Sequence, residues 1–71
     1  MQYAEMKRIE KGLVFKTVGG VMVRTTGVTT YIPSHEKYAH EVEVIEGEGE
    51  GYRYLHNLDK AELMTGYAAA A

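Results

Sequence analysis

Histidine and glutamate residues gather in the segment His35-Glu36-Lys37-Tyr38-Ala39-His40, which comes close to a zinc-protease motif. That motif needs two histidines four residues apart on a helix, because this spacing places both rings on one face beside the metal. Here the spacing is five, which rotates the second ring by about 140° at roughly 3.6 residues per turn. Pro33 precedes the segment and strand-like VEVI follows it. We therefore predict a loop entering a strand, with no metal site; whether His56 approaches the other two histidines in space stays open.

Glutamate and glycine alternate in EGEGEG, residues 46–51. A phosphate-binding loop uses backbone N–H groups and a nearby cation, and three glutamates would repel a phosphate. Calcium loops favour aspartate and asparagine at alternate positions, which this stretch lacks. The remaining interpretations are a solvated turn, or an acidic surface that meets a basic protein partner. The residues that we predict for such a protein-binding surface are Glu41, Glu43, Glu46, Glu48, Glu50 and Arg53.

Tyr52 and Tyr54 flank Arg53 in a segment that alternates like a strand. On an exposed face they could stack on the bases of a single-stranded nucleic acid, as aromatic side chains do in such proteins. In a chain with one Phe and no Trp, we favour a role in filling the core, although whether they are core or surface stays open. The nucleic-acid alternative would use Lys7, Arg8, Lys11, Arg24, Tyr52, Arg53 and Tyr54.

Residues for covalent catalysis are few. The chain has no cysteine, and Ser34, which precedes His35, is its only serine. Sequence neighbours do not by themselves place a nucleophile in line with a base. We predict no catalytic residue, no cofactor and a non-enzymatic protein; an oligomeric enzyme with a site on its symmetry axis is a third hypothesis.

Strands are predicted between Gly12 and Gly51. LVFKTV and VMVRTT flank Gly19-Gly20, a two-residue turn that suits a tight hairpin. Gly27 marks either a bulge or the start of a separate strand. HEVEVIE alternates with His40, Val42 and Val44 on one side. The predicted core is Leu13, Phe15, Val21, Val23, Val42, Val44, Leu55, Leu58 and Leu63.

The C-terminal part predicts a short helix. Asp59 and Glu62 form a capping-box pattern, with Leu58 and Leu63 at the two staple positions and Gly66 at the end. Near the N-terminus Tyr3, Met6 and Ile9 could line a helix face, but the segment is too short to decide. We expect one domain over 1–71: an N-terminal segment (1–11), a β barrel (12–58), a helix (59–65) and a tail (66–71).

These elements predict a mainly β fold, a small antiparallel barrel or bent sheet of four or five strands with a short C-terminal helix. The order of strands and glycines resembles small Src-homology-3-like barrels, including the KOW type of translation and transcription proteins. The segments that carry this resemblance are IEKGLVFKT, the GG turn, MVRTTGV, VEVIEGEGEGYRY and LDKAEL. The likeness covers residues 9–63. The chain lacks the ALYDY-like aromatic signature of the peptide-binding members, and its glycine-rich turn is acidic where nucleic-acid-binding relatives tend to be basic.

Composition and charge narrow the function classes. The chain has 71 residues and no cysteine, so its core is small and disulfides are excluded. We expect self-association to supply the additional stability, and we favour a homo-oligomer over a monomer. We expect a cytoplasmic protein without a membrane span. Residues 1–30 hold five Lys and Arg against two Glu, and residues 31–71 hold three against eight acidic residues. The function that we predict is a small binding or adaptor module with a protein partner, accessory or regulatory; a KOW-like nucleic-acid-binding protein is the alternative.

Overall fold

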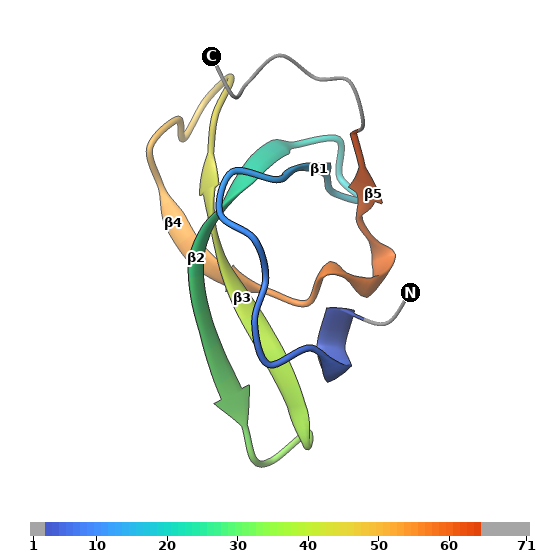
Figure 1. The fold of residues 1–71 in the computed structure, drawn as a ribbon. Helices are drawn as coiled ribbons and strands as arrows, with labels where there is room; N and C mark the ends of the chain where they lie inside the picture. The colour runs from blue at the N-terminus through green and yellow to red at the C-terminus, as the bar shows by residue number, and fades with distance from the viewer. Residues whose placement is uncertain (1–2, 65–71) are drawn as a thin grey trace.

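The computed structural model describes residues 3–64, which form one five-stranded antiparallel sheet. Its elements in chain order are the 3-10 helix η1 (Tyr3–Glu5), β1 (Val14–Lys16), β2 (Met22–Ile32), β3 (Lys37–Val44), β4 (Arg53–His56), the 3-10 helix η2 (Leu58–Lys60) and β5 (Glu62–Leu63). The strand order is β4-β3-β2-β1-β5 (Figure 1). The prediction of a mainly β, antiparallel fold is confirmed. Of its two forms, the bent sheet is the one observed, and the predicted barrel over 12–58 is wrong, because the sheet stays open with β4 and β5 at its edges.

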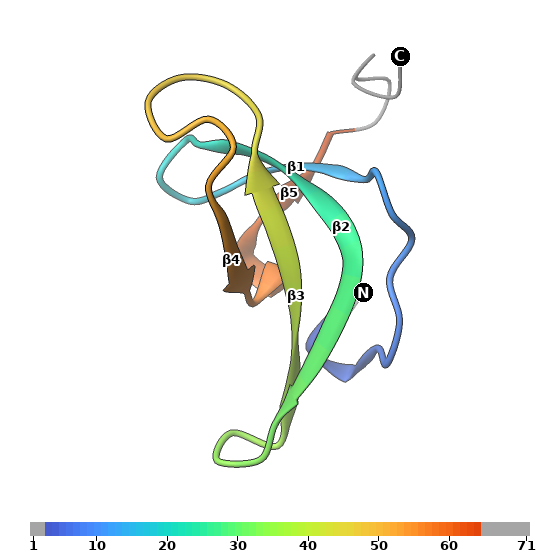
Figure 2. The same cartoon turned by 90° about the vertical axis from the view of Figure 1, so that its left-hand side faces the viewer.

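The β2–β3 hairpin consists of the two longest strands of the sheet, and it curves along its length (Figure 2). Its register places Val23 opposite Val44, Thr25 opposite Val42, Thr29 opposite His40 and Tyr31 opposite Tyr38. Cross-strand partners point to the same side of a sheet, so these pairs share one face, which we call the inner face. The alternation predicted for His40, Val42 and Val44 is confirmed, since all three are buried.

Gly27 sits at a bulge within one continuous strand. The pairing shifts between Thr25 and Thr29, and Gly27 has a φ of 92°, a left-handed conformation that glycine adopts without a Cβ penalty. Of the two alternatives from the sequence, the bulge is therefore the one observed. The bulge accompanies the bend of β2, as extra residues in one strand generally do.

The β1–β2 hairpin is confirmed, but its turn is one residue longer than predicted. Thr17 N donates to Val21 O at 2.9 Å, and Gly20 N donates to Thr17 O at 2.9 Å. Residues 18–20 therefore form the loop, in which Gly20 alone of the glycine pair has a positive φ, 86°. A three-residue loop that ends in a left-handed residue is a common hairpin form.

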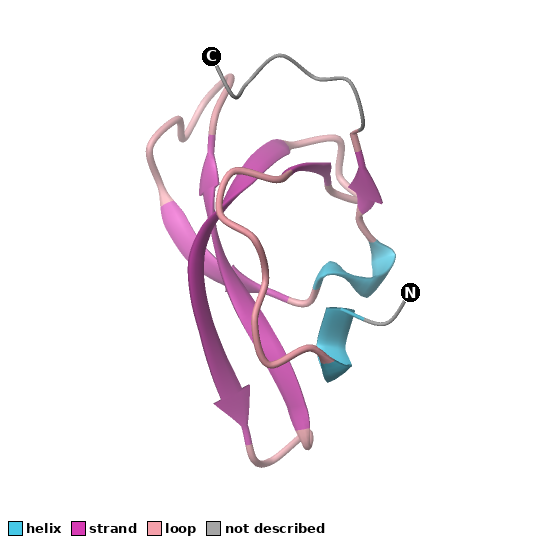
Figure 3. Ribbon diagram, in the orientation of Figure 1, coloured by secondary structure: helices cyan, strands magenta, loops and turns pink. Residues whose placement is uncertain are grey.

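The predicted helix at 59–65 is wrong over residues 59–64. Figure 3 shows only short 3-10 turns as helices, and β5 occupies Glu62–Leu63. Asn57, not Asp59, caps η2: its side chain accepts from Asp59 N at 3.0 Å. Asp59 Oδ1 instead accepts from Ala4 N at 3.2 Å. Pairing of Phe15 with Leu63 outweighs the local helix signal, because a helix of two turns is marginal without packing. Residue 65, Gly66 and the predicted tail lie outside the described residues.

The core lies between the inner face and the two 3-10 turns. Ile9, Phe15, Val23, Val42, Val44 and Leu58 form its cluster, with Tyr3, Leu13, Tyr54 and Ala61 packed against it. Of the predicted core, Val21, Leu55 and Leu63 are wrong, at 39%, 45% and 38% exposed. Val21 lies beside the hairpin loop, Leu55 points to the opposite face, and Leu63 is on an edge strand. The N-terminal segment closes the inner face through a single turn, η1, in which Ala4 is buried.

Within residues 3–64 the helical segments are single turns, and none has the length and hydropathy of a membrane-spanning helix.

Candidate functional site

The face of β2, β3 and β4 opposite the core carries a row of charged residues. We call it the outer face and define it by Arg24, Glu41, Glu43, Arg53 and Leu55. Arg24 is the cross-strand partner of Glu43, and Glu43 is the partner of Arg53. Arg53 Nε lies 3.3 Å from Glu43 Oε1, with the two side chains 61% and 26% exposed. One carboxylate thus stands between two arginine-bearing strands.

Glu41 and Leu55 continue this face toward the middle of the sheet. They are cross-strand partners, and Leu55 is 45% exposed. Glu41 Oε1 accepts a hydrogen bond from the Thr26 hydroxyl at 2.7 Å. The outer face thus combines a hydrogen-bonded carboxylate with an exposed leucine. An apolar side chain with charged residues around it matches the apolar centre and polar rim of a protein interface.

The acidic loop, residues 46–51, follows β3 and is held by backbone hydrogen bonds. Gly51 N donates to Val44 O at 2.8 Å, and Tyr52 N donates to Gly49 O at 2.8 Å. Gly47, Gly49 and Gly51 have φ values of 80°, 85° and 92°. The glycines therefore supply the backbone turns, and the glutamates between them are exposed. Glu46, Gly47 and Glu48 also line a hollow of about 430 Å³ with residues 20–22.

The protein-binding residues predicted from sequence thus form two adjoining groups. Glu41, Glu43 and Arg53 lie on the outer face, and Glu46, Glu48 and Glu50 lie on the loop that joins β3 to β4. In Figure 2 this loop is the yellow-to-orange segment above β3 and β4.

The residues of the nucleic-acid alternative are divided between several parts of the surface. Arg24 and Arg53 are on the outer face, whereas Tyr54 is the partner of Val42 on the inner face. Lys7, Arg8 and Lys11 are exposed on the segment between η1 and β1. No single face of the described residues collects the cations and both tyrosines.

The tyrosine question has a divided answer. Tyr52 is 64% exposed, while Tyr54 packs against the core. Their rings stack with centroids 5.8 Å apart. Burial raises the pKa of Tyr54 above its ordinary value of 10.0, and the neighbouring Tyr52 raises it further. Tyr54 is therefore a residue at the edge of the core, and the exposed Tyr52 stacks on its ring.

The histidines do not converge on a metal site. His40 is fully buried; its Nε2 donates to Tyr3 O at 2.8 Å and its Nδ1 lies 2.8 Å from Thr29 Oγ1. Both ring nitrogens are thus already paired. His56 is the cross-strand partner of His40, and burial lowers the pKa of His56 below 6.5. His35 lies apart, in the exposed turn before β3. No group of three metal-ligating side chains forms within residues 3–64, and the loop-to-strand prediction for 35–41 is confirmed.

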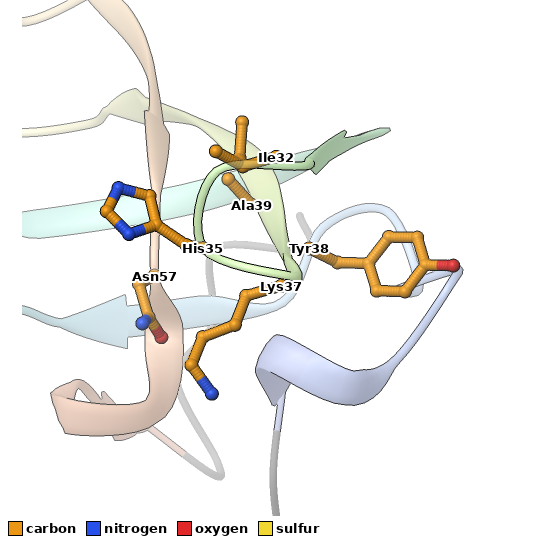
Figure 4. A pocket seen from close by; sticks show the side chains of 6 residues that line it. All are labelled: Ile32, His35, Lys37, Tyr38, Ala39 and Asn57. Atoms are coloured by element: carbon orange, nitrogen blue, oxygen red, sulfur yellow. The ribbon is translucent and has the colours of Figure 1, made fainter.

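A separate pocket lies at the tip of the β2–β3 hairpin. It has a volume of about 410 Å³ and is lined by Ile32, His35, Lys37, Tyr38, Ala39 and Asn57. Figure 4 shows His35, Lys37 and Asn57 on the same side, with the Tyr38 ring pointing away from them. The sequence does not predict this pocket, because Asn57 follows β4 and comes close to the hairpin only when β4 pairs with β3.

Comparison of this chain with known protein families, curated proteins and solved structures gives no match.

Proposed function

We propose that this chain is a small non-enzymatic binding module that acts through protein–protein contacts, as an accessory or regulatory component of a larger assembly. The observation that carries the proposal is the adjacency of the outer face and the acidic loop. Glu41 and Glu43 lead along β3 directly into residues 46–51, and β4 returns with Arg53 and Leu55 beside them. The three loop glutamates, beside an outer face that exposes Leu55, suit a partner that offers basic residues around an apolar side chain.

The negative charge of the acidic loop favours a basic partner. Like charges clustered on one surface steer an oppositely charged partner and raise its association rate. Glu41 accepts a hydrogen bond from the Thr26 hydroxyl, so part of its side-chain freedom is already lost before a partner binds. Preorganised contacts cost less on association.

Three further features belong to the same proposal. The likeness to small Src-homology-3-like barrels is supported by the strand order, in which β5 returns to pair with β1. Self-association is supported by the exposed edge strand β4, since an open edge presents unpaired backbone groups. A cytoplasmic location is supported by the absence of cysteine.

The test is affinity capture with the purified chain, followed by measurement of the dissociation constant for each captured protein. A variant with Glu46, Glu48 and Glu50 changed to Gln should bind a specific partner at least about tenfold more weakly. Each tenfold change in the dissociation constant corresponds to about 1.4 kcal/mol. The matched control changes Glu5, Glu10 and Glu62, which are exposed elsewhere, to Gln. Equal binding by both variants would refute the surface that we propose.

A second measurement separates the nucleic-acid alternative. Fluorescence anisotropy of labelled single-stranded RNA and DNA, at low and moderate salt, should show no saturable binding. Saturable binding that falls steeply with salt would favour that alternative, because phosphate contacts release counterions. Arg53→Gln and Tyr54→Phe would then identify the surface used.

A further inference from the structure

Beyond protein contacts, we propose that the pocket at the tip of the β2–β3 hairpin binds a small organic carboxylate with a short aliphatic body. Its volume of about 410 Å³ falls within the range of about 300–1,000 Å³ typical of small-molecule sites. The pocket lies where β3 begins, whereas the acidic loop follows the end of β3. The pocket and the acidic loop therefore lie at opposite ends of β3, and either proposal can fail without the other.

Lys37 gives the pocket its charge. It lines the pocket, is exposed, and its ammonium group has no hydrogen-bond or ion-pair partner within residues 3–64. None of the six lining residues is an aspartate or a glutamate. An ammonium group offers three donors and no acceptor. The unmatched charge therefore favours an anionic group in the pocket.

Asn57 adds oriented donors. Its side-chain oxygen accepts from Asp59 N at 3.0 Å as the cap of η2. Because this hydrogen bond requires the oxygen, the orientation of the amide is fixed, and its NH₂ group remains available as a donor. The cap thus sets one wall of the pocket in a defined orientation before any ligand binds.

His35 completes the polar side. It stands in the turn that joins β2 to β3, where Glu36 N donates to Pro33 O at 3.2 Å and Glu36 has a φ of 52°. It lines the pocket together with Asn57, and Figure 4 draws both side chains. An imidazole N–H is a further donor. Lysine, amide and imidazole donors together match the two oxygens of a carboxylate.

The apolar side sets the rest of the ligand. Ile32 and Lys37 are cross-strand partners, and Ala39 follows Lys37 on the same face, so aliphatic surface adjoins the charged group. The Tyr38 ring turns to the inner face and contacts Tyr31, with centroids 5.0 Å apart. The remaining space is thus bordered by a small methyl group and a branched aliphatic chain. A short alkyl chain fits this lining better than a sugar or an aromatic ring.

The test is an amide ¹H–¹⁵N NMR titration with hexanoate, at constant ionic strength. Hexanoate should give saturable shifts centred on Lys37, Ala39 and the Asn57 side-chain NH₂. Acetate lacks the aliphatic body and hexanamide lacks the charge. Each should bind at least about tenfold more weakly than hexanoate. Equal binding of hexanamide, shifts centred elsewhere, or the absence of saturable shifts would overturn the proposal.

Variants locate the binding in the pocket. Lys37→Gln should weaken hexanoate about tenfold, and Lys37→Arg should retain most of the binding. Asn57→Asp keeps a good cap residue but places a carboxylate against the ligand, so it should abolish binding. Lys16→Gln, on the exposed side of β1, is the matched control and should leave binding unchanged. If Lys16→Gln and Lys37→Gln weaken binding equally, the site is a general charge effect and the proposal is wrong.

Discussion

His40 Nε2 lies 2.8 Å from the backbone carbonyl oxygen of Tyr3, which joins the N-terminal turn to the middle of β3 across 37 residues of sequence. A carbonyl oxygen can only accept, so Nε2 carries the hydrogen. In the neutral ring Nδ1 then accepts from the Thr29 hydroxyl, 2.8 Å away. His40 therefore connects three separate segments from a fully buried position.

The Thr29–His40 hydrogen bond should contribute measurably to stability. Thr29→Val keeps the shape of the side chain but leaves the buried Nδ1 without its partner, which costs about 1 to 3 kcal/mol. The next residue, Thr30, is exposed on the other face of β2, so Thr30→Val is the control and should change stability by less than about 0.5 kcal/mol. Urea denaturation of the two variants measures both values. Equal stabilities would show that the histidine is not held by this contact.

The bulge at Gly27 should resist substitution. Its φ of 92° is a left-handed conformation that costs an L-residue about 1 to 2 kcal/mol. A Cβ at Gly27 would meet Lys11 Cβ at 3.4 Å, an ordinary contact, so the backbone conformation dominates the cost. Gly19 has no left-handed φ, and a Cβ there would lie 3.9 Å from Thr17 Oγ1.

Thermal unfolding should therefore separate Gly27→Ala from Gly19→Ala. For a domain of this size about 1 kcal/mol lowers Tm by roughly 4–8 °C, and only the first variant should show it. A comparable loss in both variants would contradict the conformational explanation.

Much of the β pattern could be predicted because it is local. The burial of Val42, Val44 and His40 follows from strict alternation in one strand, and the break at Pro33 follows from the missing N–H of proline. Phe15 and Val23 are apolar residues near the middle of the β1–β2 hairpin, and both are fully buried. These predictions needed no knowledge of distant contacts.

The errors arose where distant contacts decide. The Asp59–Glu62 pattern is a sound local helix signal, but Asp59 binds Ala4 N and Leu63 pairs with Phe15. The hydrophobic character of Leu55 predicts a core position, but its pairing with Glu41 puts it on the outer face. The pocket at the hairpin tip needs Asn57, which follows β4 and caps η2, and no spacing in the sequence indicates that approach.

His56 should make stability depend on pH. Burial lowers its folded-state pKa below the ordinary value of 6.5, so the unfolded chain binds a proton more readily than the folded chain. Its contribution to stability is present above about pH 6.5 and is lost as the pH falls through the folded-state pKa. His56→Gln removes this titration. Comparing thermal unfolding at pH 7.5 and 5.0 should show a smaller loss in the variant than in the original chain; an identical loss would place the dependence on other groups.

The Arg53–Glu43 ion pair should contribute little to folding. The two atoms are 3.3 Å apart, but the arginine side chain is 61% exposed, so solvent screens most of the attraction. A double-mutant cycle with Arg53→Gln and Glu43→Gln should give a coupling of about 0.2–1 kcal/mol, which decreases as salt is added. A coupling well above this range, unchanged by salt, would mean that the pair is structural. A small coupling leaves both side chains free to exchange their mutual contact for contacts with a partner, as the proposed binding surface requires.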